Sequence, residues 1–147
     1  MVENDINTHV IAVTGIVEKD GKYLLAKRSV KDLQAGGEWS IPGGKVDLEI
    51  GTGILELTLK KEISEEVGIE IEDRIELICN DAFIRVSGHH VVMLTFLCKY
   101  KSGEAKVLED QEEVRWVSWK EMDSMWSELP EYTKRRFEAL KKYVTSA

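Results

Sequence analysis

Three glutamates on one face of a predicted helix constrain this chain more than any other feature of its sequence. Residues 54–67 (ILELTLKKEISEEV) have a helical pattern, and Gly68 fits a C-terminal cap. Glu62, Glu65 and Glu66 stand at i, i+3 and i+4. A helix places three such carboxylates on one face, within about 100° of arc.

Like charges at this spacing repel by a few tenths of a kcal/mol per pair. The carboxylates are therefore either a solvated helix face, which an acidic chain favours, or ligands for a cation such as Mg²⁺ or Mn²⁺, which prefer oxygen. Two features favour the cation. Leu59, Ile63 and Val67 form an apolar stripe beside the glutamates, and a glycine-rich turn, Pro42-Gly43-Gly44, precedes the helix. Glycines at such a turn expose backbone groups to a ligand.

The remaining pattern alternates strands with helices. We expect strands over 9–17, 22–28, 77–85, 90–100 and 114–117, a short extended piece over 39–41, and helices over 120–125 and 131–144. Ser118 is a plausible N-cap. Interleaved strands and helices predict an α/β fold with a mixed sheet and helices on its faces. The length of 147 residues predicts one domain over 1–147.

Composition excludes several functional classes. The net charge is −7, which disfavours stable nucleic-acid binding. No apolar run is long enough for a membrane span, and the acidic N-terminus lacks the features of a secretory signal. We therefore expect a cytosolic protein with no membrane contact. Cys79 and Cys98 lie in apolar runs with no metal or redox spacing, which predicts two reduced structural cysteines.

PGGKVD followed by KEISEEVGI resembles the box of the Nudix (MutT-like) hydrolases, which reads Gly, five residues, Glu, seven residues, then Arg-Glu-U-x-Glu-Glu-x-Gly-U, with U a bulky aliphatic residue. The similarity extends from about His9 to Met122. It implies a Nudix-type α/β/α sandwich and a magnesium- or manganese-dependent enzyme. Such an enzyme cleaves the diphosphate linkage of a nucleoside di- or triphosphate derivative by attack of water on phosphorus.

Two positions depart from the family's box. Lys61 stands where the family has arginine, and the expected box glutamate falls on Gly53. Gly44 lies three residues too far from Lys61, so the loop over 47–53 carries an insertion, from which Glu49 is a candidate replacement. Lysine keeps the charge of arginine but loses its two-pronged geometry. These changes place catalytic rate in question more than metal binding.

The resemblance also implies a set of site residues. The catalytic candidates are Glu62, Glu65 and Glu66, with Glu66 the first choice of general base and Glu109, Glu112 or Glu113 the rivals. The metal ligands it implies are the Gly43 carbonyl, Glu62, Glu65, Glu66 and Glu112. Arg28 and Lys45 are candidate phosphate contacts. The alternative is that both are basic surface side chains without a specific ligand. Independently of the resemblance, the aromatic rings of Trp39 and Phe83 are candidates to stack a base, although core packing is the more common role of such residues.

The sequence leaves two functions of different classes open. The retained glutamates favour an active hydrolase, whereas Gly53 and Lys61 favour a nucleotide-binding module with weak or no turnover. An interaction domain that binds no small-molecule ligand is a third alternative. The expected partners are a small nucleotide-type substrate and, as an open alternative, a second copy of the chain in a homodimer.

Overall fold

A computed structural model describes residues 8–34, 36–48 and 50–146. Within them, seven strands form one sheet. Its strands are β1 (Val10–Lys19), β2 (Lys22–Arg28), β3 (Trp39–Ser40), β4 (Gly43–Lys45), β5 (Glu70–Ile84), β6 (His90–Ser102) and β7 (Gln111–Val117). The helical elements are α1 (Ile54–Val67), α2 (Trp119–Ser124), the 3-10 turn η2 (Trp126–Glu128) and α3 (Glu131–Ser146).

The sheet is mixed, as predicted. Its main strand order is β3-β2-β1-β6-β5, with β4 added to β1 and β7 to β2. β1 and β6 run parallel, and the other pairs are antiparallel. Asp20 and Gly21 close the β1–β2 hairpin, and both have positive φ angles, of 50° and 79°. Asp-Gly is a preferred pair in such a turn because its left-handed backbone matches the twist of the strands.

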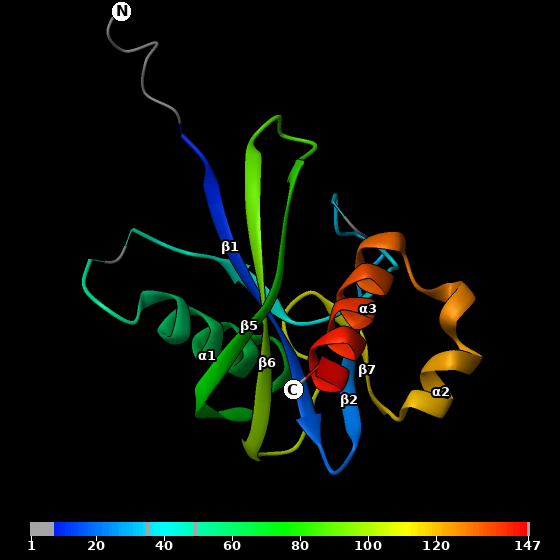
Figure 1. Cartoon of the computed structure of the whole chain (residues 1–147). Helices are drawn as coiled ribbons and strands as arrows, with labels where there is room; N and C mark the ends of the chain where they lie inside the picture. Colours follow the sequence, from blue (N-terminus) through cyan, green and yellow to red (C-terminus); the bar gives the residue numbers. More distant parts are fainter. Residues whose placement is uncertain (1–7, 35, 49, 147) are drawn as a thin grey trace, which may run out of the picture.

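Helices cover both faces of the sheet, which confirms the predicted α/β/α sandwich (Figure 1). One core lies under α1 and includes Val13 of β1 and Ile63 of α1. The second lies under α2 and α3 and includes Ile16 of β1 and Phe137 of α3. β1 contributes to both cores because successive side chains of a strand point to opposite faces.

Several predicted elements have the expected bounds. The helix α1 spans the predicted residues, and Ser118 caps α2 with a reciprocal capping box involving Glu121. β5 begins at Glu70, seven residues before the predicted start at residue 77. Its first part, EIEDRIE, is charged because most of its side chains are exposed at the edge of the sheet.

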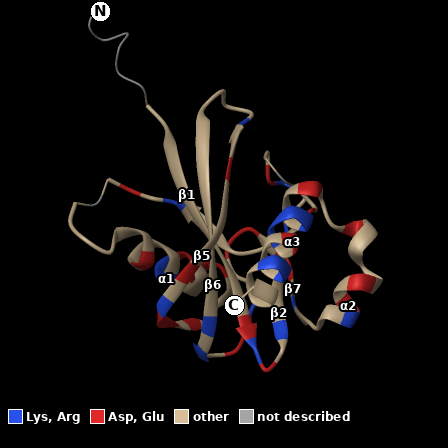
Figure 2. Ribbon diagram, viewed as in Figure 1, with Lys and Arg blue, Asp and Glu red and all other residues tan. Residues whose placement is uncertain are grey.

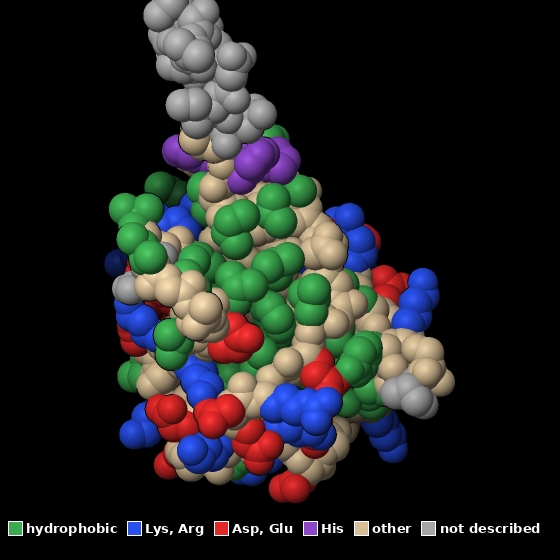
Figure 3. Space-filling view, turned by 60° about the vertical axis from the view of Figure 1, so that its left-hand side comes forward, with side chains coloured by type: hydrophobic (Ala, Val, Ile, Leu, Met, Phe, Trp, Pro, Cys, Tyr) green, Lys and Arg blue, Asp and Glu red, His purple; other side chains and the backbone are tan. Residues whose placement is uncertain are grey.

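Part of the sheet surface on the side of α1 remains uncovered. Leu77 and Ile84 of β5 are exposed there. Figure 3 shows hydrophobic side chains gathered on this side of the molecule, below the histidines. The structure describes a single chain, so the homodimer considered above stays a prediction.

Among the described residues, no helix is both long enough and apolar enough to cross a bilayer.

Candidate functional site

The glycine turn is built into the sheet. β4 pairs with β1 through Gly43 opposite Thr14, and the Thr14 hydroxyl donates a hydrogen bond to the Pro42 carbonyl at 2.9 Å. A Cβ atom at Gly43 would lie 2.2 Å from the Val13 carbonyl oxygen, so only glycine fits here. The sequence predicted a tight backbone at this place but missed that it forms a strand.

Glu66 anchors α1 to this turn. The Gly43 amide donates to Glu66 Oε2 at 2.9 Å, and the Gln111 side-chain amide reaches Glu66 Oε1 at 3.5 Å. Glu66 is only 6% exposed. Burial raises the pKa of Glu66 to about 7, against the opposing effects of the Gly43 hydrogen bond and the Arg28 charge. A carboxyl group titrating near neutrality is suited to general acid–base chemistry.

Glu62 lies against the second glycine of the turn. A Cβ atom on Gly44 would come within 2.5 Å of the Glu62 carboxyl carbon. The pKa of Glu62 is raised, first by burial and then by the negative charge of Glu65. None of the three glutamates is fully exposed, and Glu66 is buried. The solvated-face alternative therefore does not fit Glu66.

The donors at this turn match a hard cation. Glu62 and Glu66 supply only carboxylate oxygens, the ligand type of Mg²⁺ and Mn²⁺. Neighbouring acids contribute to the raised pKa of each carboxyl group, and a bound cation would relieve that repulsion. Within the described parts of the chain, no three acidic, histidine or cysteine side chains already converge around a metal position. The carboxylates of Glu62 and Glu66 are suitable ligands for a metal ion. Their side chains must rotate before they can surround one.

The three glutamates considered as alternatives to Glu66 lie in different places: they are Glu109, Glu112 and Glu113. The charge of Glu109 raises the pKa values of both Glu62 and Glu66, so Glu109 approaches the site. Glu112 is exposed on β7, and Glu113 on the same strand is paired with Arg115 at 2.8 Å. Glu109, between β6 and β7, is therefore better placed than Glu112 to complete the site.

Lys61 in the altered box has a different acidic neighbour from the one that the family signature suggests. Lys61 Nζ lies 3.7 Å from Asp47 Oδ2, at the start of the lengthened loop. Gly53 has a φ of 68° and caps the start of α1, a conformation that glutamate would adopt only with strain. Asp47 thus stands as an acidic partner for Lys61. Glu49, the candidate replacement, lies outside the described residues.

We expect Asp47→Asn and Lys61→Gln each to lower kcat about 10-fold, since residues that support metal ligands commonly affect function by roughly 10- to 100-fold. The double variant is expected to be no slower than the slower single variant, because both changes break one interaction. Steady-state kinetics of the four proteins checks this. Additive losses would show that the two side chains act separately.

A cleft of about 500 Å³ opens beside the glycine turn. Arg28, Lys45 and Phe83 line it, so three of the four predicted substrate contacts come together. Arg28 also pairs with Asp32 at 3.2 Å. Phe83 is half-buried on β5 and lines the same cleft.

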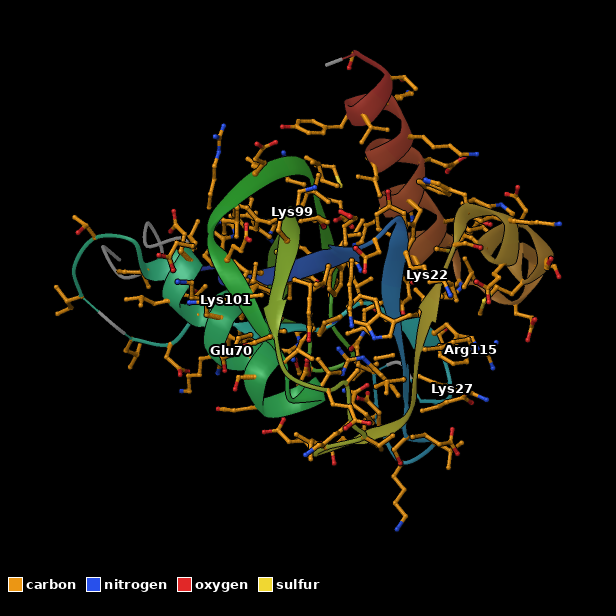
Figure 4. The ribbon with its side chains drawn as sticks, turned by 90° about the horizontal axis from the view of Figure 1, so that it is seen from below. Lys22, Lys27, Glu70, Lys99, Lys101 and Arg115 are labelled. Atoms are coloured by element: carbon orange, nitrogen blue, oxygen red, sulfur yellow. The ribbon has the colours of Figure 1, made fainter. Side chains whose placement is uncertain are left out.

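The fourth predicted contact, Trp39, lies in the core under α2 and α3 rather than among the cleft-lining residues. It is 5% exposed, and Thr133 of α3 donates a hydrogen bond to its carbonyl at 2.8 Å. Arg115 and Lys27 cover its ring, at 5.1 and 5.9 Å from the ring centroid, and Figure 4 shows both on neighbouring strands. This placement supports core packing, rather than base stacking, as the role of Trp39.

Sequence reasoning missed the far wall of the cleft. Asp81 of β5 and Tyr132, Arg135 and Arg136 of α3 all line it. Figure 2 shows the basic residues of α3 on the side of the sheet away from α1. The one signal in the sequence was a charged residue, Arg136, inside the apolar stripe of the last helix.

The fold and the site together define an α/β/α sandwich in which an acidic helix packs behind a glycine turn. The family model of the NUDIX domain matches residues 8–142. The chain therefore belongs to the NUDIX family, and the resemblance of its box is confirmed.

Known proteins similar to this chain include hydrolases of several nucleotides. An ADP-ribose pyrophosphatase from Methanocaldococcus jannaschii is 34% identical over 106 residues, which are 72% of this chain and 60% of that protein. The nucleoside triphosphatase NudI from Escherichia coli is 31% identical over 114 residues, 71% of this chain and 79% of the relative. A MutT NUDIX hydrolase from Burkholderia pseudomallei has a crystal structure with a TM-score of 0.74 at 31% identity, covering 90% of this chain and 98% of its own.

Proposed function

We propose that this chain is a magnesium- or manganese-dependent hydrolase of the diphosphate linkage in a nucleoside di- or triphosphate derivative, with water attacking phosphorus. The observation that carries the proposal is the position of Glu66. It is a buried carboxyl group with a pKa of about 7 that accepts a hydrogen bond from Gly43. Gly43 and Gly44 line the cleft, and Glu66 lies behind them rather than among the lining residues. A solvated structural glutamate would have neither this burial nor this pKa.

The cleft suits a polyanionic substrate. Five basic side chains line it (Arg28, Lys45, Arg85, Arg135 and Arg136), against two acidic ones (Asp32 and Asp81), although the whole chain has a net charge of −7. This local excess of positive charge attracts phosphates into the cleft of an otherwise acidic protein. The positions of Arg28 and Lys45 near the glycine turn support a role in orienting the diphosphate.

Glu66 is suited to accept the proton of the attacking water. Gly43 holds Oε2 in place with a 2.9 Å hydrogen bond, which leaves Oε1 with only the longer 3.5 Å contact from Gln111. Oε1 is therefore the freer atom for proton transfer. Glu62, Glu65 and Glu66 would hold the metal, with Glu109 or Glu112 and the Gly43 carbonyl as further donors. When bound, the metal neutralises phosphate charge and lowers the pKa of a water molecule.

The names of the relatives support the substrate class. They include an ADP-ribose pyrophosphatase and a nucleoside triphosphatase, and both substrates contain a nucleoside with a diphosphate linkage. The second candidate is a nucleotide-binding module with little turnover, which Gly53 and Lys61 favour. The Asp47–Lys61 pair offers a replacement for the missing support and so favours the hydrolase. One domain and a cytosolic location remain part of this proposal.

The test is a substrate screen with the purified chain. Nucleoside triphosphates, nucleotide sugars, dinucleotides and ADP-ribose are incubated with Mg²⁺ or Mn²⁺, and release of monophosphate or phosphate is measured. We expect turnover of at least one class, lost on addition of EDTA. Nucleotide binding without turnover across the whole panel would instead establish the binding module.

A matched pair of variants tests the metal ligands. Glu62→Gln is expected to weaken Mn²⁺ binding in calorimetry and to abolish most turnover, since it removes a charged oxygen ligand beside Gly44. Glu56→Gln, an exposed change in the first turn of α1, is expected to leave both unchanged. Equal Mn²⁺ affinities for the two variants would remove Glu62 from the proposed ligand set.

A further inference from the structure

A buried arginine stands at the far wall of the cleft without a full set of partners. Arg136 of α3 is 4% exposed, and its Nε atom has no hydrogen-bond partner within the described structure. Its Nη2 atom lies 3.8 Å from Asp81 Oδ1, longer than a good charge-assisted hydrogen bond. Unsatisfied donors on a buried charged group are costly. A site that keeps them is therefore suited to a ligand that supplies acceptors.

The surrounding side chains hold Arg136 in place. Its guanidinium lies over the Tyr132 ring, 5.1 Å from the centroid, and the Tyr132 hydroxyl donates to Glu38 at 3.1 Å. Arg136 and Asp81 both line the cleft. Phe83 follows Asp81 by two residues on β5, so both side chains point to the same face of the sheet. An aromatic ring, a donor fork and a carboxylate thus share one end of the cleft.

The pairing of Arg136 with Asp81 limits what this end can bind. A phosphate close to Arg136 would also meet the negative charge of Asp81, which repels it. A neutral planar group that offers acceptors to Arg136 and a donor to Asp81 meets no such penalty. Phe83 adds a flat apolar surface on which such a group can stack.

We propose, on the basis of the function proposed above, that Asp81 and Arg136 determine base specificity and select guanine or cytosine. These two bases carry both a carbonyl oxygen, which accepts from Arg136, and an exocyclic amino group, which donates to Asp81. Adenine lacks the carbonyl, and uracil lacks the amino group. Arginine bonded to guanine acceptors and an acidic side chain bonded to the cytosine amino group are familiar pairings in base recognition.

The test measures binding rather than turnover, so that it stays separate from the hydrolase proposal. GMP, CMP, AMP and UMP are titrated into the full chain in EDTA by calorimetry. We expect GMP, CMP or both to bind at least about 10-fold more tightly than AMP and UMP, the discrimination of a good arginine–base contact. Equal affinities for all four would overturn the inference, whether or not the chain hydrolyses any substrate. Base selectivity without hydrolysis would sink only the proposed function.

Variants assign the selectivity to single groups. IMP differs from GMP only by the missing amino group. Asp81→Asn is therefore expected to reduce the preference for GMP over IMP, and Asp81→Ala is expected to bring the ratio of the two affinities to about one. Arg136→Lys is expected to weaken GMP and CMP about 10-fold, because lysine lacks the guanidinium fork. Lys142→Gln, exposed on α3 and outside the cleft, is the control.

The Asp81 variants still test the proposal if Arg136→Lys does not fold. The Asp81 side chain is 36% exposed, so Asp81→Asn leaves the core intact and keeps an oxygen near Arg136. Circular dichroism of each variant confirms folding before titration. An unchanged GMP-to-IMP ratio in folded Asp81→Asn and Asp81→Ala would refute the role of Asp81.

Discussion

Glu66→Gln is expected to lower kcat about 100- to 10,000-fold, the range of a general base, and to stabilise the metal-free protein at alkaline pH. Glutamine cannot accept the proton of water, and it removes a charged ligand. The fold should tolerate the change, since the new amide oxygen can still accept from Gly43. Gln111 Oε1, which has no partner in the described structure, can accept a hydrogen bond from the new amide group after Gln111 rotates.

The gain in stability follows from the raised pKa of Glu66. Its pKa is about 7 in the folded chain, against an ordinary value of 4.5 for an exposed glutamate, so between these values the folded chain binds more protons than the unfolded chain. The free energy of unfolding therefore falls as pH rises through this window, by up to about 3 kcal/mol. Glu66→Gln removes this loss, so its advantage over wild type should be present at about pH 8 and absent near pH 4.

Urea unfolding in EDTA at several pH values checks the stability, and steady-state kinetics with Mg²⁺ checks the rate. Glu138→Gln, an exposed change on α3, is the control and should alter neither quantity. The prediction fails if Glu66→Gln retains wild-type turnover, or if it is less stable than wild type at alkaline pH. Wild-type turnover would remove Glu66 as the general base, whereas lower stability at alkaline pH would contradict its raised pKa.

The sequence predicted the part of the site that depends on local spacing. Helical periodicity places Glu62, Glu65 and Glu66 on one arc, and Gly68 ends the helix as a left-handed cap. The same periodicity does not predict which of the three carboxylates is the most buried. Glu66 is the most buried because the Gly43 amide and Gln111 meet it from β4 and β7, and strand pairing brings those groups together.

The far wall of the cleft depends on contacts between distant segments. Arg136 occupies an apolar stripe of α3 with Thr133, Phe137 and Leu140, and its partner Asp81 lies on the edge strand β5. Nothing in the local sequence around either residue indicates the other. The partner of Lys61 in the lengthened loop is equally hidden from the local sequence. Lys61 is paired with Asp47, whereas counting residues along the box signature places the expected partner at Gly53. In both cases three-dimensional packing determines the partner.

Gly43→Ala is expected to destabilise the chain by about 3 kcal/mol and to remove most activity. A Cβ atom there would lie 2.2 Å from the Val13 carbonyl oxygen and 2.6 Å from the Thr14 Cα. Both are backbone atoms of a central strand, so they cannot move aside as a flexible side chain would. Overpacking of this kind commonly costs about 1 to 3 kcal/mol, and a backbone clash belongs at the upper end. Moving β4 away from β1 also displaces the Gly43 amide from Glu66.

Gly44→Ala is the matched control, because its clash is of a different kind. The new Cβ atom would meet the Glu62 carboxylate, the end of a side chain that can rotate away. Thermal unfolding should therefore show a much smaller loss of stability for Gly44→Ala than for Gly43→Ala. Calorimetry with Mn²⁺ should show weaker metal binding for Gly44→Ala, since Glu62 is displaced. If Gly43→Ala unfolds at the same temperature as wild type, β4 is not held against β1 as described, and the hydrogen bond that positions Glu66 loses its support.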